Sequence, residues 1–158
     1  MGLDMLLTKE TIIPSRDYDD NHNYVVTVKD TGNDYNDVIS RRVTSVTETI
    51  AQWRKDNQIH GWFVRNLQND IDDCGKYVAD KDTIEKLYMD LGSALYKKNN
   101  EKAEKLFPPT EGFFFGGNTM DEVYWGGLKY TYSIVKIVLE EMKRADNNNS
   151  TYYYISSW

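Results

Sequence analysis

One stretch constrains the fold more than any other part of the chain. Residues 52–68 read QWRKDNQIHGWFVRNLQ, in which Ile59, Phe63 and Leu67 recur at the spacing of one helix face. The acidic sequence NDIDDCG follows this stretch directly. We therefore predict an amphipathic core helix over residues 52–68, against which the rest of the chain packs.

The predicted helix has a polar and aromatic rim. Trp53 and His60 extend its apolar face on a wheel of about 3.6 residues per turn. The opposite face is polar and consists of Arg54, Gln58 and Arg65. Lys55 and Trp62 lie at the margin of this polar face.

Composition limits the class of protein. A chain of 158 residues with 13% aromatics and a formal charge of −6 fits one acidic globular domain over residues 1–158. The negative charge argues against sequence-independent nucleic-acid binding, which needs a basic surface. The single cysteine, Cys74, excludes an internal disulfide and a cysteine-rich zinc site. We find neither a membrane-length apolar run nor a signal sequence, and expect a cytoplasmic protein.

Runs of β-branched and aromatic residues predict a sheet. We expect strands at residues 3–13, 24–29, 43–50, 76–79 and 152–158. The nearly continuous apolar start of the first run predicts a central strand. The aromatic last run predicts a strand that is tucked into the sheet.

Helices fill intervals between these strands. Asp82 and Glu85 form a capping box ahead of a helix that continues to Leu95, and residues 101–107 predict a short helical segment.

A second capping box, Thr119 with Glu122, opens the longest helix, which extends to about Ala145. Gly126-Gly127 inside it would let another segment or a ligand approach the backbone closely. The predicted fold class is therefore α+β, a mixed or mainly antiparallel sheet with about three helices packed mainly on one face.

His60 is the sharpest candidate for chemistry. Imidazole titrates near neutral pH, so His60 would suit a general base, for example in a hydrolase with Asp72 or Asp73. On an apolar face, a buried histidine bonded to a backbone carbonyl or a strand side chain is the commoner outcome. Asp70 begins an EF-hand-like spacing, but Lys81 stands where the bidentate glutamate is needed. We expect no metal site.

A second candidate lies where the longest helix begins. Residues 116–119, GGNT, lead into a capped helix start, where free amides and the helix dipole favour an anion. Plain helix capping is the commoner explanation of such residues.

Aromatic residues exceed what one small core needs. We expect some at the surface, where rings stack on bases or fill a partner's pocket, although a homo-oligomer interface explains them as well. The candidates are Trp62, the phenylalanines at 113–115, Tyr124, Trp125, the tyrosines at 152–154 and Trp158.

Five motifs in order, MGLDM, WRKDNQIHGWFV, DDCG, PTEGFFFGG and YYYISSW, resemble a family of small proteins encoded in bacteriophage genomes. Members often carry tyrosine where this chain has Leu6. The resemblance brings no activity or catalytic residue with it. It implies a phage accessory protein in the cytoplasm of an infected bacterium, of a kind that antagonises host defence.

Three hypotheses of function follow. The first is a non-enzymatic protein without cofactor that sequesters a small phosphorylated nucleotide, an immune signal, by stacking and by phosphate contacts from Arg54, Lys55, Arg65 or the amides near Thr119. The second is an acidic inhibitor that covers the basic surface of a host defence protein or CRISPR-type effector. The third is a hydrolase that uses His60. The residues predicted to bind the ligand of the first hypothesis are Trp53, Arg54, Asn57, His60, Trp62, Arg65, Phe114, Gly117, Thr119 and Trp158.

Overall fold

The computed structural model describes residues 2–13, 44–110, 116–144 and 149–158. Its four strands are β1 Asp4–Ile12, β2 Ser45–Arg54, β3 Lys76–Val78 and β4 Ser150–Ser157. Its four helices are α1 Asn57–Leu67, α2 Lys81–Leu95, α3 Asn100–Leu106 and α4 Glu122–Arg144. The strands form one antiparallel sheet in the order β2-β1-β4-β3, so the predicted α+β class is confirmed.

The middle of the sheet comes from segments far apart in the sequence. β1 pairs with β2 on one side and with β4 on the other, and Leu7 lies opposite both Ala51 and Tyr154. The predictions that the first strand is central and that the last strand is tucked into the sheet are both correct. A β-bulge between Leu7 and Thr8 shifts the register against β2.

Helices cover one face of this sheet. Met5, Trp53 and Tyr154 are buried on that face, where the ring of Phe63 from α1 stacks on Tyr154 at 3.9 Å between centroids. The Trp53 indole donates a hydrogen bond to the Thr131 hydroxyl of α4, at 2.9 Å. Burial of each such large side chain contributes roughly 1.5–3 kcal/mol, which holds α1 and α4 against the strands.

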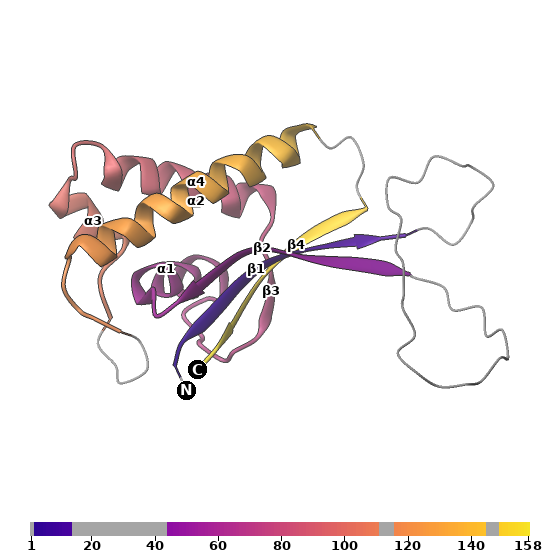
Figure 1. Ribbon diagram of the computed structural model, residues 1–158, viewed down its shortest axis with the longest axis horizontal. Helices are drawn as coiled ribbons and strands as arrows, with labels where there is room; N and C mark the ends of the chain where they lie inside the picture. The colour runs from indigo at the N-terminus through magenta and orange to yellow at the C-terminus, as the bar shows by residue number, and fades with distance from the viewer. Residues whose placement is uncertain (1, 14–43, 111–115, 145–148) are drawn as a thin grey trace, which may run out of the picture.

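The remaining helices pack on α4. In Figure 1, α2 and α4 lie side by side above the strands, and the rings of Tyr88 and Tyr132 stack between them at 4.9 Å. The Tyr124 hydroxyl of α4 donates to the Phe107 carbonyl at 2.9 Å and so holds the end of α3. None of the helices in the described ranges is both long and apolar enough to span a membrane.

The predicted helix over residues 52–68 is wrong in its first part. Residues 52–54 belong to β2, where Trp53 pairs with Met5 of β1. Lys55 then adopts φ 61°, and its amide donates to the Leu3 carbonyl at 2.8 Å, which ends the strand. The helix begins only at Asn57 because pairing with β1 takes the preceding residues.

The predicted polar face of this helix is also partly wrong. Gln58 and Trp62 are buried, because Gln58 lies against Gly127 of α4 and Trp62 contacts α2. The Trp62 indole donates to the Asp90 carboxylate of α2 at 2.9 Å.

Two predicted helix caps are displaced by two residues each. Asp80, not Asp82, accepts the Thr83 amide at the start of α2, at 2.8 Å. Asp121, not Thr119, accepts the Tyr124 amide at the start of α4, at 3.0 Å. Both segments offer several capping side chains in succession, and packing decides which one caps. The predicted strand at 24–29 and Phe114 lie outside the described residues.

The two glycines of α4 differ in their surroundings. A Cβ on Gly127 would lie 2.2 Å from Oδ1 of Asp56, in the connection between β2 and α1, whereas a Cβ on Gly126 would meet nothing within 4 Å. The predicted close approach of another segment to the α4 backbone is therefore found at Gly127 and not at Gly126.

Gly126→Ala should stabilise the protein by about 1 kcal/mol through helix propensity. Gly127→Ala should be less stable than Gly126→Ala by roughly 1 kcal/mol, because its methyl group displaces the Asp56 carboxylate and the hydrogen bond that Gln58 donates to it. Urea unfolding followed by circular dichroism measures both. Equal effects of the two substitutions would contradict the assignment of the close contact to Gly127.

Candidate functional site

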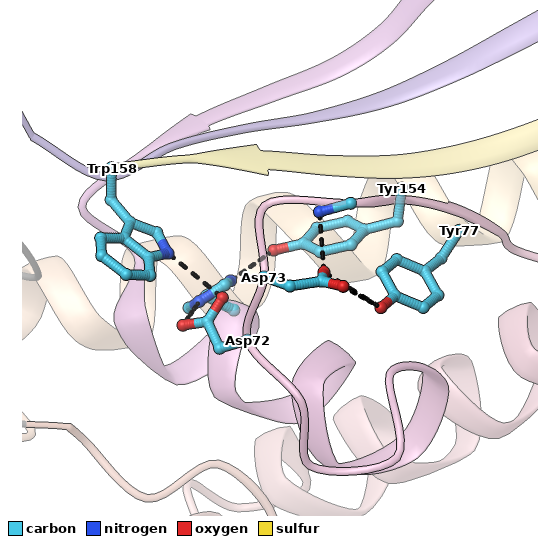
Figure 2. A network of polar contacts seen from close by, with 7 residues as sticks. Asp72, Asp73, Tyr77, Tyr154 and Trp158 are labelled. Atoms are coloured by element: carbon cyan, nitrogen blue, oxygen red, sulfur yellow. Dashed lines mark hydrogen bonds and ion pairs between the residues drawn. The ribbon is translucent and has the colours of Figure 1, made fainter.

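A chain of polar contacts links α1, the loop after it and the end of β4. The His60 Nδ1 atom lies 2.7 Å from the Tyr154 hydroxyl, and Nε2 lies 2.9 Å from Oδ2 of Asp72. The Trp158 indole donates to Oδ1 of the same carboxylate at 3.1 Å, as Figure 2 shows. This histidine network, Tyr154–His60–Asp72–Trp158, therefore ties the C-terminal segment of β4 to the helix.

Burial limits what this network can do chemically. His60 is 3% exposed and Tyr154 is 0% exposed, and both ring nitrogens of His60 have a partner. Burial raises the pKa of the Tyr154 phenol well above its ordinary value, and the negative charge of Asp72 raises it further. The phenol is thus neutral at physiological pH. His60 does contact Asp72, as a hydrolase would require. However, the imidazole is buried and both of its nitrogens are bonded within the protein, which is the pattern of a structural histidine.

The acidic turn after α1 satisfies its own polar groups. Asp73 accepts hydrogen bonds from the Tyr77 hydroxyl at 3.0 Å and from the Gly75 amide at 2.9 Å (Figure 2). Cys74 is exposed and has φ 56°, a turn conformation. Across the described residues, no three His, Cys, Asp or Glu side chains gather closely enough to hold a metal ion.

The tryptophans predicted to stack on a base lie in the core. Trp53 and Trp62 are buried, and their indole N–H groups are bonded to Thr131 and Asp90. Their positions do not suit base stacking. Trp158 is exposed and lies at the histidine network instead.

Three of the residues predicted to bind a ligand, Asn57, Gly117 and Thr119, lie around the start of α1. The buried Asn57 amide donates to the Gly117 carbonyl and accepts from the Thr110 amide, both at 2.8 Å. A cavity of about 200 Å³ opens beside this clamp. Its lining residues are Lys55, Asp56, Gln58, Gly117, Thr119, Asp121, Val123 and Tyr124.

The charges at this small cavity do not favour the anion predicted there. The carboxylates of Asp56 and Asp121 both line it and oppose the single ammonium of Lys55. Burial raises the pKa of Asp56, against the lowering effect of its hydrogen bond from Gln58. The volume of about 200 Å³ is also below the roughly 300–1,000 Å³ of ordinary ligand pockets.

The two predicted arginines lie outside this cavity. Arg54 is exposed and faces Asp4 at 3.9 Å across the strand pair. Arg65 donates to the Leu106 carbonyl at 3.1 Å; burial lowers its pKa, and Asp70 raises it. The predicted binding residues therefore divide between the core, the small cavity and separate surface positions.

A larger cavity, of about 340 Å³, was not predicted. It lies between the core face of the sheet, the start of α2 and the second half of α4. We call it the α2–α4 cavity. Its lining residues are Lys9, Val78, Ala79, Asp80, Lys81, Glu141, Met142, Ser150, Thr151 and Tyr152. Because five elements contribute these residues, no local pattern in the sequence identifies them.

An ion pair closes one side of the α2–α4 cavity. The Lys9 ammonium contacts the Glu141 carboxylate, and this hydrogen bond, more than the one from Tyr152, holds the pKa of Glu141 below its ordinary value. The pair joins β1 to α4.

Comparison of the chain with protein-family models, curated proteins and solved structures finds no significant match. The resemblance to small phage proteins therefore stays a prediction.

Asp72→Ala should destabilise the protein by roughly 1–3 kcal/mol, because His60 and the Trp158 indole both lose their acceptor. The Trp158 indole NH signal in an NMR spectrum should shift as well. Glu85→Ala, at an exposed position of α2, is the control and should change stability by less than about 0.5 kcal/mol. Similar losses in the two variants would show that the network does not hold the C-terminal segment.

Glu141→Gln should reduce stability at neutral pH by about 1 kcal/mol, since the ion pair is partly exposed. A lowered pKa in the folded state means that the contribution exists above the ordinary value of 4.5 and disappears as the pH falls through the folded pKa. Unfolding measured between neutral and acidic pH should therefore show the two proteins converging in acid. Glu85→Gln, on the exposed side of α2, is the control. A difference in stability between Glu141→Gln and the unmodified protein that does not change with pH would contradict the ion-pair account.

Proposed function

We propose that this chain is a non-enzymatic binding protein that holds a small phosphorylated ligand, of mononucleotide size, in the α2–α4 cavity. The observation that carries the proposal is the cavity itself, whose volume of about 340 Å³ lies within the usual range of roughly 300–1,000 Å³ for ligand pockets. Of the tryptophans predicted to bind the ligand, Trp53 and Trp62 are in the core and Trp158 is bonded in the histidine network, so the ligand is assigned to this different place.

The lining supplies two kinds of contact. Val78, Ala79 and Met142 offer an apolar surface for a planar base. Lys81, the first residue of α2, offers an ammonium group beside the helix start, where the first amides have no intrahelical acceptor. A ligand with an apolar ring and a phosphate would use both.

The acidic side chains of the cavity have partners of their own. Glu141 is bonded by Lys9 and Tyr152, and Asp80 accepts the Thr83 amide. The lining also balances its two carboxylates with two ammonium groups, those of Lys9 and Lys81, whereas the small cavity has one ammonium group for two carboxylates. Lys81 is thereby the group that is placed to attract a phosphate.

The other hypotheses have less support from the geometry. A hydrolase needs an accessible base, and His60 is buried with both nitrogens occupied. An acidic inhibitor is supported by the net charge of −6 alone. Together with the resemblance, ligand binding without turnover would make the protein a sponge for a nucleotide signal in the cytoplasm of an infected bacterium.

Native mass spectrometry with linear and cyclic mononucleotides tests the proposal. A retained ligand that is released unchanged on denaturation is the expected result, and Lys81→Glu should weaken binding at least about tenfold by repelling the phosphate. Lys102→Glu, an exposed lysine of α3, is the matched control.

Two outcomes would contradict the proposal. Binding that Lys81→Glu and Lys102→Glu weaken equally would show that the ligand lies elsewhere. Conversion of the nucleotide into a new product, abolished by His60→Ala, would establish the hydrolase instead.

A further inference from the structure

One exposed side of α4 carries a row of large apolar side chains. Val123, Tyr130 and Ile137 are 78%, 47% and 65% exposed. They follow one another at intervals of seven residues, close to two helix turns, so they lie along one line on the helix surface. The other side of the same helix is buried against the sheet and α2. This apolar row is therefore not needed for the core.

A row of lysines lies on the same exposed side of α4, about 100° around the helix from the apolar row, with Gly126, Ser133 and Glu140 between the two rows. Lys129, Lys136 and Lys143 also recur every seven residues, and all three are exposed. None of them forms an ion pair with another residue of the described ranges. The acidic residues of the helix are paired instead: Glu122 with Lys98, Glu140 with Arg144 and Glu141 with Lys9. The local charge of this face is positive, although the chain carries a net −6.

Gly126 leaves an opening in the apolar row. It is exposed, lies one turn after Val123, and has open space where a side chain would begin. A large apolar side chain of a partner can enter a gap of this kind as a knob enters a hole between helices.

We propose that this face of α4 docks an acidic amphipathic helix of a partner protein. Apolar side chains of the partner, spaced by heptads, would lie on Val123, Tyr130 and Ile137, and its carboxylates would face the lysine row. Charge complementarity selects this occupant, because the lysines pair with no carboxylate among the residues that the structure describes. The proposal is independent of the α2–α4 cavity.

The same charges disfavour two other occupants. A second copy related by a two-fold axis through Tyr130 would place the lysine row against its own equivalent, and like charges repel. An anionic membrane is broader than this face and would also meet other, acidic parts of the chain, whereas a docked helix meets α4 alone.

The test uses two labelled synthetic helices of about three heptads. Both have leucine at the heptad core positions; one has glutamate and the other lysine at the flanking positions. Fluorescence anisotropy should show micromolar binding of the glutamate peptide, and binding of the lysine peptide at least about tenfold weaker. Val123→Ser/Ile137→Ser should abolish binding, and Lys129→Glu/Lys136→Glu should reverse the preference between the peptides.

Matched controls are Met89→Ser, an exposed apolar residue of α2, and Lys102→Glu on α3, neither of which should alter binding. Unfolding midpoints confirm that all variants are folded. The proposal is overturned by equal binding of the two peptides, by equal losses in the controls, or by binding only to vesicles of anionic lipid. Self-association seen by analytical ultracentrifugation and removed by Val123→Ser/Ile137→Ser would assign the face to a second copy instead.

Discussion

The antiparallel pairing of β1 with β4 is the constraint on which the rest of the structure depends. It sets Leu7 opposite Tyr154 and turns Tyr154 toward the helices. There the ring stacks on Phe63, and the hydroxyl meets His60, which holds Asp72. Because side chains alternate between the two faces of a strand, a slip of one residue would turn Tyr154 to the opposite face and remove both contacts. The histidine network is thus a consequence of backbone register.

Local patterns in the sequence predicted the elements well and their limits less well. The first and last strands are recognisable because their apolar and aromatic runs are long enough to show a strand pattern. Over residues 52–54, an apolar residue between two polar ones fits a strand and a helix equally. Only the partner strand decides between them, and Met5 lies almost fifty residues away in the chain. Asp80 and Asp82 likewise have the same capping chemistry, and packing chooses the first.

The same distinction applies to the candidate sites: contacts between residues close in sequence could be predicted, and contacts between distant residues could not. His60 and Asp72 are twelve residues apart, and a helix followed by a tight turn brings them together, so their pairing was predictable. Tyr154 is 94 residues from His60, and only the sheet register reveals that contact. A count of aromatic residues says that rings are in excess but not which ones are buried. The α2–α4 cavity, lined by five elements, leaves no local signal at all.

Charge shows most clearly why composition is a poor guide to partners. The net charge of −6 suggested a basic partner, yet it is a sum over the whole chain. Within the described part of the chain, the carboxylates of α4 are paired and its lysines are not, so the local sign is opposite. At physiological salt, charges are screened beyond about 8 Å, so a docked helix is sensitive mainly to this local face. The lysines therefore attract an acidic partner only at short range and do little to bring it to this face. Apolar contact along Val123, Tyr130 and Ile137 must consequently supply much of the affinity.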